Sequence, residues 1–190
     1  MTLKKIAKFM ILVVIGISLV GCSDKKNTTT TQNNETTNSS IDTASYDRGY
    51  LVIPEEEVKD MEKMTCTRQG NGEDDSKVKL NYTLYYKGEY LQILHSIEQV
   101  ISKDQDILDE YQFAYINIYK NYENLEYYET SVVREEDSIT NDTVINYSKL
   151  DTDKLLEIEG EEDNIIKDGK VKLDDWLEFA EKFGTTCDKN

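Results

Sequence analysis

The 190-residue sequence contains one histidine and three cysteines, and it has few basic residues for its length. A single histidine excludes a metal site built from several imidazoles, and no motif for a Ser-His-Asp relay accompanies it. The 22 Lys and Arg residues against 38 Asp and Glu give a net charge of −16. Such a chain is a poor ligand for nucleic acid or an anionic membrane surface. We expect cations or basic proteins as charged partners, although the same excess also keeps a domain soluble.

The sequence also lacks an apolar run of the roughly 20 residues that a transmembrane helix needs. Its longest run, Phe9 to Val20, follows three lysines, which is typical of a secretory signal. The end of this run, Leu19-Val20-Gly21-Cys22, resembles the lipobox of bacterial lipoproteins. The resemblance implies that residues 1–21 are removed and that Cys22 is acylated with diacylglycerol. The alternative is an anchor that is never cut.

Acylation of Cys22 would tether the protein to the outer face of the bacterial cell membrane, since two acyl chains anchor more firmly than one. The following residues, up to 45, are mostly Thr, Asn, Ser and charged residues. They have too little apolar surface to fold, so residues 22–45 are expected to form a disordered stalk. Residues 46–190 have the length of a single globular domain.

The pattern of apolar residues in 46–190 predicts an α+β fold with an antiparallel sheet of about four to five strands. Apolar and polar residues alternate over 77–87, and a turn at Lys87-Gly88 leads into a second strand at 90–101. We expect Leu91, Ile93, Ile97 and Ile101 on one side of that strand, together with His95. Further strands are expected at 64–69, 126–134 and 143–147.

Helical periodicity begins after this hairpin. A long helix of about five turns is expected from Asp104, with its core stripe at Ile107, Tyr111, Ala114, Ile118, Tyr122 and Leu125. Short helices are expected after Pro54 and Asp151. The last helix is expected to carry Trp176, Leu177, Ala180 and Phe183 on one face, with Gly184 at the position just after its C-terminal end.

Cys66 and Cys187 are the only thiols that remain once Cys22 is lipidated. An even pair of cysteines outside the cytoplasm tends to oxidise. The expected disulfide would join the first strand to the tail after the last helix. The alternative is two free thiols, with Cys66 buried and Cys187 at a frayed terminus.

Several short segments between about residues 63 and 187 resemble the small bacterial lipoproteins typified by YehR. They are Cys66-Thr67-Arg68-Gln69-Gly70, Tyr86-Lys87-Gly88, Tyr122-Glu123-Asn124-Leu125, Ile145-Asn146-Tyr147-Ser148-Lys149-Leu150 and Lys170-Val171-Lys172-Leu173. The resemblance implies the α+β fold class and the lipoprotein address. The family has no assigned activity, so the resemblance implies no catalytic residue.

Four features could carry chemistry. His95 is expected to be packed or at a sheet edge rather than catalytic. The stretch Asp168-Gly169-Lys170-Val171 resembles the second half of an EF-hand loop, but this alignment places Ile166 at a ligand position, so we expect a β-turn and no metal site. The acidic clusters at 135–137 and 157–163 could supply a glycosidase pair, although a solvated surface is the simpler interpretation. Tyr115 and Tyr119, one turn apart on the long helix, are possible partner-binding residues.

The sequence therefore favours a lipid-anchored, non-enzymatic surface protein that binds a protein or an envelope component, with no catalytic residues, cofactor or nucleic-acid partner. One alternative is an acidic inhibitor that sequesters a cationic secreted protein or peptide. The other is an envelope hydrolase that uses two carboxylates. The oligomeric state is left open.

Overall fold

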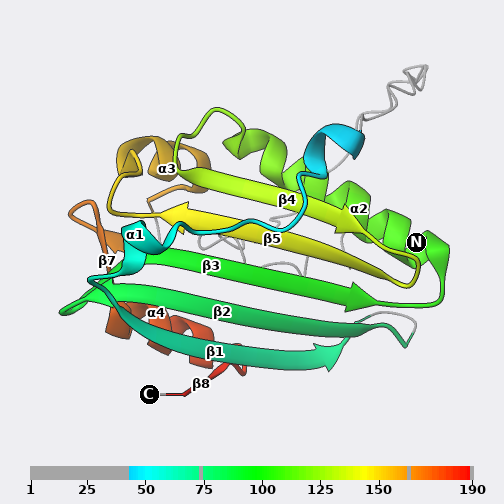
Figure 1. Ribbon diagram of the computed structural model, residues 1–190, viewed down its shortest axis with the longest axis horizontal. Helices are drawn as coiled ribbons and strands as arrows, with labels where there is room; N and C mark the ends of the chain where they lie inside the picture. Colours follow the sequence, from blue (N-terminus) through cyan, green and yellow to red (C-terminus); the bar gives the residue numbers. More distant parts are fainter. Residues whose placement is uncertain (1–42, 73–74, 162–163, 189–190) are drawn as a thin grey trace, which may run out of the picture.

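The computed structural model describes residues 43–72, 75–161 and 164–188 and has an α+β fold built around an antiparallel sheet (Figure 1). Six strands follow one another across the sheet in the order β4-β5-β3-β2-β1-β8. They are β1 (Glu62–Asn71), β2 (Lys77–Lys87), β3 (Tyr90–Ile101), β4 (Tyr128–Arg134), β5 (Ser138–Asn146) and β8 (Thr186–Asp188). Two further short strands, β6 (Ile166–Lys167) and β7 (Lys170–Lys172), form a hairpin beside β3. The sheet is thus larger than the four to five strands expected from the sequence.

The helices are α1 (Glu55–Val58), α2 (Gln105–Tyr119), α3 (Thr152–Glu159) and α4 (Leu173–Glu181), with 3-10 turns η2 (Thr43–Tyr46) and η3 (Lys120–Tyr122). Because η3 continues α2 directly, the two make one 18-residue helix after the first hairpin, as the sequence predicts. The Asp104 carboxylate caps its first turn by accepting from the Asp106 N–H at 3.0 Å. The short C-terminal helix α4 is followed by Gly184 at φ +82°.

The hairpin of β2 and β3 contains an irregularity that the sequence does not reveal. Alternation along β2 buries Val78, Leu80, Tyr82 and Leu84 on the face that the helices cover. The register between the strands shifts at Tyr85/Tyr86, so that Gln92 is an extra residue in β3. Leu91 therefore lies on the opposite face from Ile93, His95, Ile97 and Ile101. The expectation that Leu91 shares their side is wrong, because a one-residue bulge exchanges the two faces of a strand.

Helix α2 covers the inner face of the sheet, behind β4 and β5 in Figure 1, and α4 lies behind β1 and β2. The side chains of α2 that are buried are Ile107, Leu108, Tyr111, Tyr115, Ile116 and Tyr119. The expected core stripe is thus wrong at Ala114 and Ile118, which are only partly buried. Among the side chains that face the sheet instead is Tyr119, whose hydroxyl accepts from Asn141 Nδ2 and so gives a buried polar group of β5 a hydrogen-bond partner.

The outer face of the sheet is crossed by the N-terminal segment, defined here as Tyr46–Pro54. Figure 1 shows it running across β4 and β5 before it turns into α1. Two hydrogen bonds from its backbone hold it to the sheet: the Arg48 N–H donates to Ser131 Oγ at 2.9 Å, and the Leu51 N–H donates to Asp142 Oδ2 at 2.9 Å. Tyr46 also packs against the apolar core, so the segment is held by polar and apolar contacts together.

Cys66 and Cys187 form a disulfide, as the sequence predicts. The two residues are direct partners in the β1–β8 ladder, which brings the sulfurs together across the two strands. The short strand β8 was not expected from the sequence. It is three residues long and its pairing with β1 is fixed by the bond.

Candidate ligand-binding site

A cavity of about 280 Å³ opens where the end of α2, the start of β4 and the N-terminal segment meet. Four tyrosines, Tyr46, Tyr119, Tyr122 and Tyr128, line it together with Ser45, Arg48, Glu123 and Thr130. These residues come from three separate parts of the chain, and the fold brings them together. We call this the tyrosine cavity. It combines an aromatic wall with two charged and two hydroxyl side chains, a mixture that small-molecule sites use to fix a ligand's orientation.

The wall of the cavity is a packed aromatic cluster. The rings of Tyr122 and Tyr128 stack with their centroids 4.4 Å apart, and Tyr119 lies tilted against both at 6.1 and 6.2 Å. The Tyr128 hydroxyl is buried and has no hydrogen-bond partner among the described residues. The wall is therefore rigid and apolar in its rings, with hydroxyl groups at the ends of the side chains.

The N-terminal segment closes one side of the cavity through two polar contacts. The Tyr46 hydroxyl donates to the Glu123 carboxylate. The Arg48 guanidinium donates through Nε and Nη2 to the backbone carbonyl of Thr130, on the edge strand β4. Arg48 and Glu123 thus place one positive and one negative charge on the same cavity.

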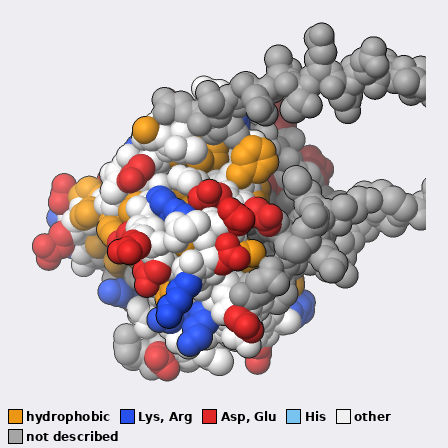
Figure 2. All heavy atoms as spheres, turned by 90° about the vertical axis from the view of Figure 1, so that its right-hand side faces the viewer, with side chains coloured by type: hydrophobic (Ala, Val, Ile, Leu, Met, Phe, Trp, Pro, Cys, Tyr) orange, Lys and Arg blue, Asp and Glu red, His pale blue; other side chains and the backbone are white. Residues whose placement is uncertain are grey.

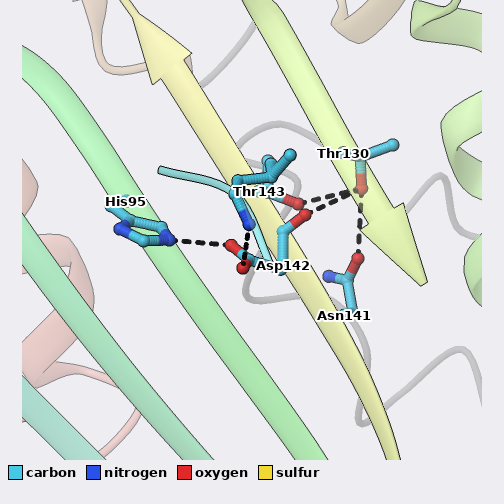
Figure 3. A network of polar contacts seen from close by, with 6 residues as sticks. His95, Thr130, Asn141, Asp142 and Thr143 are labelled. Carbon is cyan, nitrogen blue, oxygen red and sulfur yellow. Dashed lines mark hydrogen bonds and ion pairs between the residues drawn. The ribbon is translucent and has the colours of Figure 1, made fainter. Parts of the chain in front are cut away.

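Behind the cavity, a polar network on β5 fixes two of its lining residues (Figure 3). The Thr130 hydroxyl donates to Asn141 Oδ1 at 3.2 Å, and Asn141 Nδ2 donates to the Tyr119 hydroxyl at 2.9 Å. The next residue, Asp142, points to the outer face and contacts His95 Nε2 at 2.7 Å. Its other carboxylate oxygen accepts from Leu51, so neighbouring residues of β5 hold both the cavity wall and the N-terminal segment.

Two carboxyl groups, the buried Glu98 and the half-buried Glu159, lie close to the tyrosines. Burial raises the pKa of Glu159 from its ordinary value near 4.5 to about 7, against hydrogen bonds from Asn164 and Tyr122 that lower it. Burial also raises the pKa of Glu98, on β3, to about 7, opposed by the Tyr115 hydroxyl and then by the Arg68 charge. The Tyr115 hydroxyl has no well-aligned hydrogen bond, so it offsets the burial only in part. Both acids are therefore partly protonated near neutral pH.

A different end of the molecule carries a concentration of acidic residues. Figure 2 views this end and shows Asp and Glu side chains over much of it, with fewer Lys and Arg. A depression of about 450 Å³ there is lined by Asp75, Asp104 and Asp137 together with Lys77 and Lys103. Among the described residues, no three His, Cys, Asp or Glu side chains converge as a metal site would require.

The structure separates the residues that the sequence proposed as sites. Tyr115 and Tyr119 are each 2% exposed, so the expectation that they form a partner-binding surface is wrong: both face the sheet. Tyr119 nevertheless contributes to the wall of the tyrosine cavity. His95 is packed against Asp142 with 17% of its side chain exposed. Cys22 lies outside the described residues.

The supposed half EF-hand is a tight β-hairpin turn. Asp168 and Gly169 both have positive φ, +51° and +71°, between β6 and β7, which is typical of a type I′ turn. Ile166 is buried in β6. The Asn164 side chain accepts from the Ile166 N–H at 2.9 Å and donates to Glu159 and Gly160, so its polar atoms serve the local fold.

No protein family and no curated protein matches the sequence. Among solved structures, the chain is similar to the NMR structure of a protein from Streptococcus pneumoniae TIGR4, with a TM-score of 0.45 and 14% sequence identity. The match covers 88% of this chain and 100% of the other. Within the part of the chain that the structure describes, no helix is both long and apolar enough to cross a membrane.

Proposed function

We propose that this protein is an extracytoplasmic lipoprotein, anchored to the outer face of the cell membrane through Cys22, whose folded part binds an envelope component without catalysing a reaction. The observation that carries the proposal is the tyrosine cavity, which has a rigid aromatic wall and is closed by the segment next to the expected stalk. Residues in its lining are held by backbone and side-chain contacts rather than poised as nucleophile and base.

The lipobox-like stretch and the Cys66–Cys187 disulfide support the extracytoplasmic address. Disulfides persist in oxidising compartments and are rare in the cytosol of most organisms. The similarity to lipoproteins typified by YehR agrees with this address. Replacing Cys22→Ala should abolish palmitate incorporation and release the protein from the membrane fraction. Membrane retention without palmitate incorporation would mean that residues 1–21 form an uncut anchor, and palmitate incorporation that persists would place the lipid on another residue.

The binding function is tested by sedimentation with isolated cell envelopes of the producing bacterium. Envelopes stripped of endogenous protein should carry down the added full-length Cys22→Ala protein in a saturable manner. Arg48→Met, which removes one charge from the cavity, should weaken this binding, whereas Lys59→Met, on the exposed end of α1, should not. If Arg48→Met and Lys59→Met bind the envelopes equally strongly, the binding site lies outside the tyrosine cavity. If envelope fragments are cleaved and released, the protein is an enzyme.

A second function is favoured by the acidic end seen in Figure 2. An acidic surface steers a cationic protein to itself, and this attraction weakens as salt rises. If the protein sequesters such a partner, calorimetry at low ionic strength should detect binding to a basic lysozyme. Absence of heat under these conditions would remove the inhibitor hypothesis and leave the cavity proposal untouched.

A further inference from the structure

The charges around the tyrosine cavity restrict the ligand that it can hold. The Arg48 guanidinium has five N–H donors, and its contacts with Thr130 use Nε and Nη2. A cationic ligand is attracted by Glu123 but repelled by Arg48, and an anionic ligand is attracted by Arg48 but repelled by Glu123. A neutral ligand that both donates and accepts hydrogen bonds can use both groups without either repulsion.

The hydrogen-bonding groups of the cavity call for a ligand that both donates and accepts. Arg48 can only donate, and the ionised Glu123 carboxylate can only accept. Tyr46 already donates to one Glu123 oxygen, which leaves the second oxygen as the acceptor for a ligand. Hydroxyl groups on neighbouring carbons supply both a donor and an acceptor, which matches the acceptor on Glu123 and the donors on Arg48.

The volume of the tyrosine cavity and the side chains of its wall narrow the class of ligand that it can bind. The cavity, at about 280 Å³, lies at the lower end of the range of roughly 300–1,000 Å³ for small-molecule sites, so it suits one ring rather than a long chain segment. Three of the four rings, Tyr119, Tyr122 and Tyr128, are only 2%, 4% and 6% exposed and form the packed back of the cavity. The half-buried Tyr46 ring is the one that a ligand can lie against, and its apolar face and hydroxyl edge match the C–H face and hydroxyl rim of a pyranose. Along the sequence, Tyr46 lies two residues before Arg48, and Tyr122 directly precedes Glu123.

From this geometry we infer that the tyrosine cavity binds a single neutral sugar unit of an envelope glycan, with Arg48 and Glu123 on its hydroxyl groups. The inference rests on the proposed binding function of the same cavity and adds the class of ligand. Closure by the N-terminal segment makes the site a pocket for a terminal or side-branch sugar, rather than a groove along a polymer.

The test is a ligand-observed NMR titration of the full-length protein in detergent with three sugars of the same ring size. They are N-acetylglucosamine, which is neutral, glucosamine, which is cationic, and glucuronate, which is anionic. We expect saturable binding of N-acetylglucosamine and at least about tenfold weaker binding of the charged sugars. No saturable binding of the neutral sugar, or equal binding of all three, would overturn the inference.

Substitutions of Arg48 and Glu123 should change the preference for charged over neutral sugars, which a purely structural role of these residues would not do. Glu123→Gln should improve glucuronate binding, because it removes the repulsion, and Arg48→Met should weaken binding of the neutral sugar about tenfold. Two matched controls, Glu126→Gln and Arg134→Met, lie outside the cavity lining and should leave all three sugars unchanged. If Glu123→Gln does not change the preference between charged sugars, the charge argument is wrong.

The envelope sedimentation separates this inference from the proposed function. Arg48-dependent envelope binding without binding of N-acetylglucosamine would leave the binding function standing and reject the sugar class. Loss of both would reject the cavity as a site altogether.

Discussion

The two edges of the sheet are closed in different ways. At the β1 edge, the short strand β8 pairs with Thr65–Thr67 and is bonded covalently through Cys66 and Cys187. At the β4 edge, Arg48 covers the Thr130 carbonyl through side-chain hydrogen bonds. An exposed edge strand invites pairing with other chains, so both arrangements protect the sheet. Only the polar closure can open without breaking a covalent bond, and the tyrosine cavity lies at this edge.

The largest expected effect comes from removing the covalent closure. The disulfide joins residues 121 apart in sequence, and a loop of that length gives up to about 4–5 kcal/mol in the chain-entropy model. Cys66→Ala with Cys187→Ala should therefore lower the free energy of unfolding by several kcal/mol in urea titrations. Reduction of the wild type with dithiothreitol is the matched control, since it breaks the bond without removing the sulfurs. If neither changes stability, packing alone holds the β1 edge.

The stability of the fold should depend on pH through Glu98 and Glu159. Their pKa values in the folded state, about 7, exceed the ordinary value near 4.5, so the folded state binds more protons between these values. The contribution of these two groups to the free energy of unfolding should be greatest below about pH 4.5. It should fall as the pH rises to about 7 and stay constant above that pH. The size is on the order of 3 kcal/mol for each fully shifted group.

Glu159→Gln separates the two contributions, because Glu159 contacts Tyr122 in the cavity wall whereas Glu98 lies near Arg68 of β1. The Gln amide oxygen can accept from Asn164 and its N–H can donate to the Tyr122 hydroxyl oxygen. Since the amide does not titrate, the fall in stability between pH 5 and pH 7 should become smaller. The exposed neighbour variant Glu157→Gln should behave as the wild type. An unchanged pH profile in Glu159→Gln would show that this carboxyl is not protonated in the folded state.

Asp142→Ala should loosen the N-terminal segment at its middle. The buried carboxylate accepts from the Leu51 N–H and contacts His95, and leaving buried polar groups without partners costs about 1–3 kcal/mol. Hydrogen exchange of the Leu51 amide should become faster, while exchange of Thr65–Thr67 at the β1 edge stays slow. Faster exchange at both edges would mean that the two closures are coupled.

Arg48→Met should have the smallest effect on stability, about 1 kcal/mol, because its hydrogen bonds are exposed to solvent. Its effect should be local: the amides of β4 near Thr130 should exchange faster. Lys59→Met is the control, since Lys59 is exposed. A loss of stability as large as that from removing the disulfide would contradict the view of this edge as a weak closure.

The main elements of the fold follow from the sequence because β2, β3, α2 and α4 have strong apolar periodicity. The strand β5 was expected only at 143–147, since its buried residues Asn141 and Asp142 are polar and mask the pattern. The bulge at Gln92 leaves no local signal, and β6, β7 and β8 are too short for periodicity to detect. Strand pairing, rather than local preference, determines all of these.

The site was harder to predict than the fold. Tyr119 is predicted from the sequence to bind a partner, but the structure turns it inward, where its hydroxyl accepts from Asn141 of β5. Arg48 lies in a stretch that the sequence leaves ambiguous, and Glu123 is one acid among 38. The three meet only through contacts distant in sequence. An unusually polar buried strand is the one signal that could have drawn attention to this region.

The most direct test of the account is site-specific photo-crosslinking on intact cells. A photoreactive amino acid is placed at Ser45, which is exposed and lines the tyrosine cavity, or at Gln69, which is exposed on β1. We predict that Ser45 captures envelope glycan or another envelope component and that Gln69 does not. Capture at Ser45 should be reduced in Arg48→Met. Capture at Gln69 alone, or at neither position, would contradict the claim that the protein binds at its β4 edge.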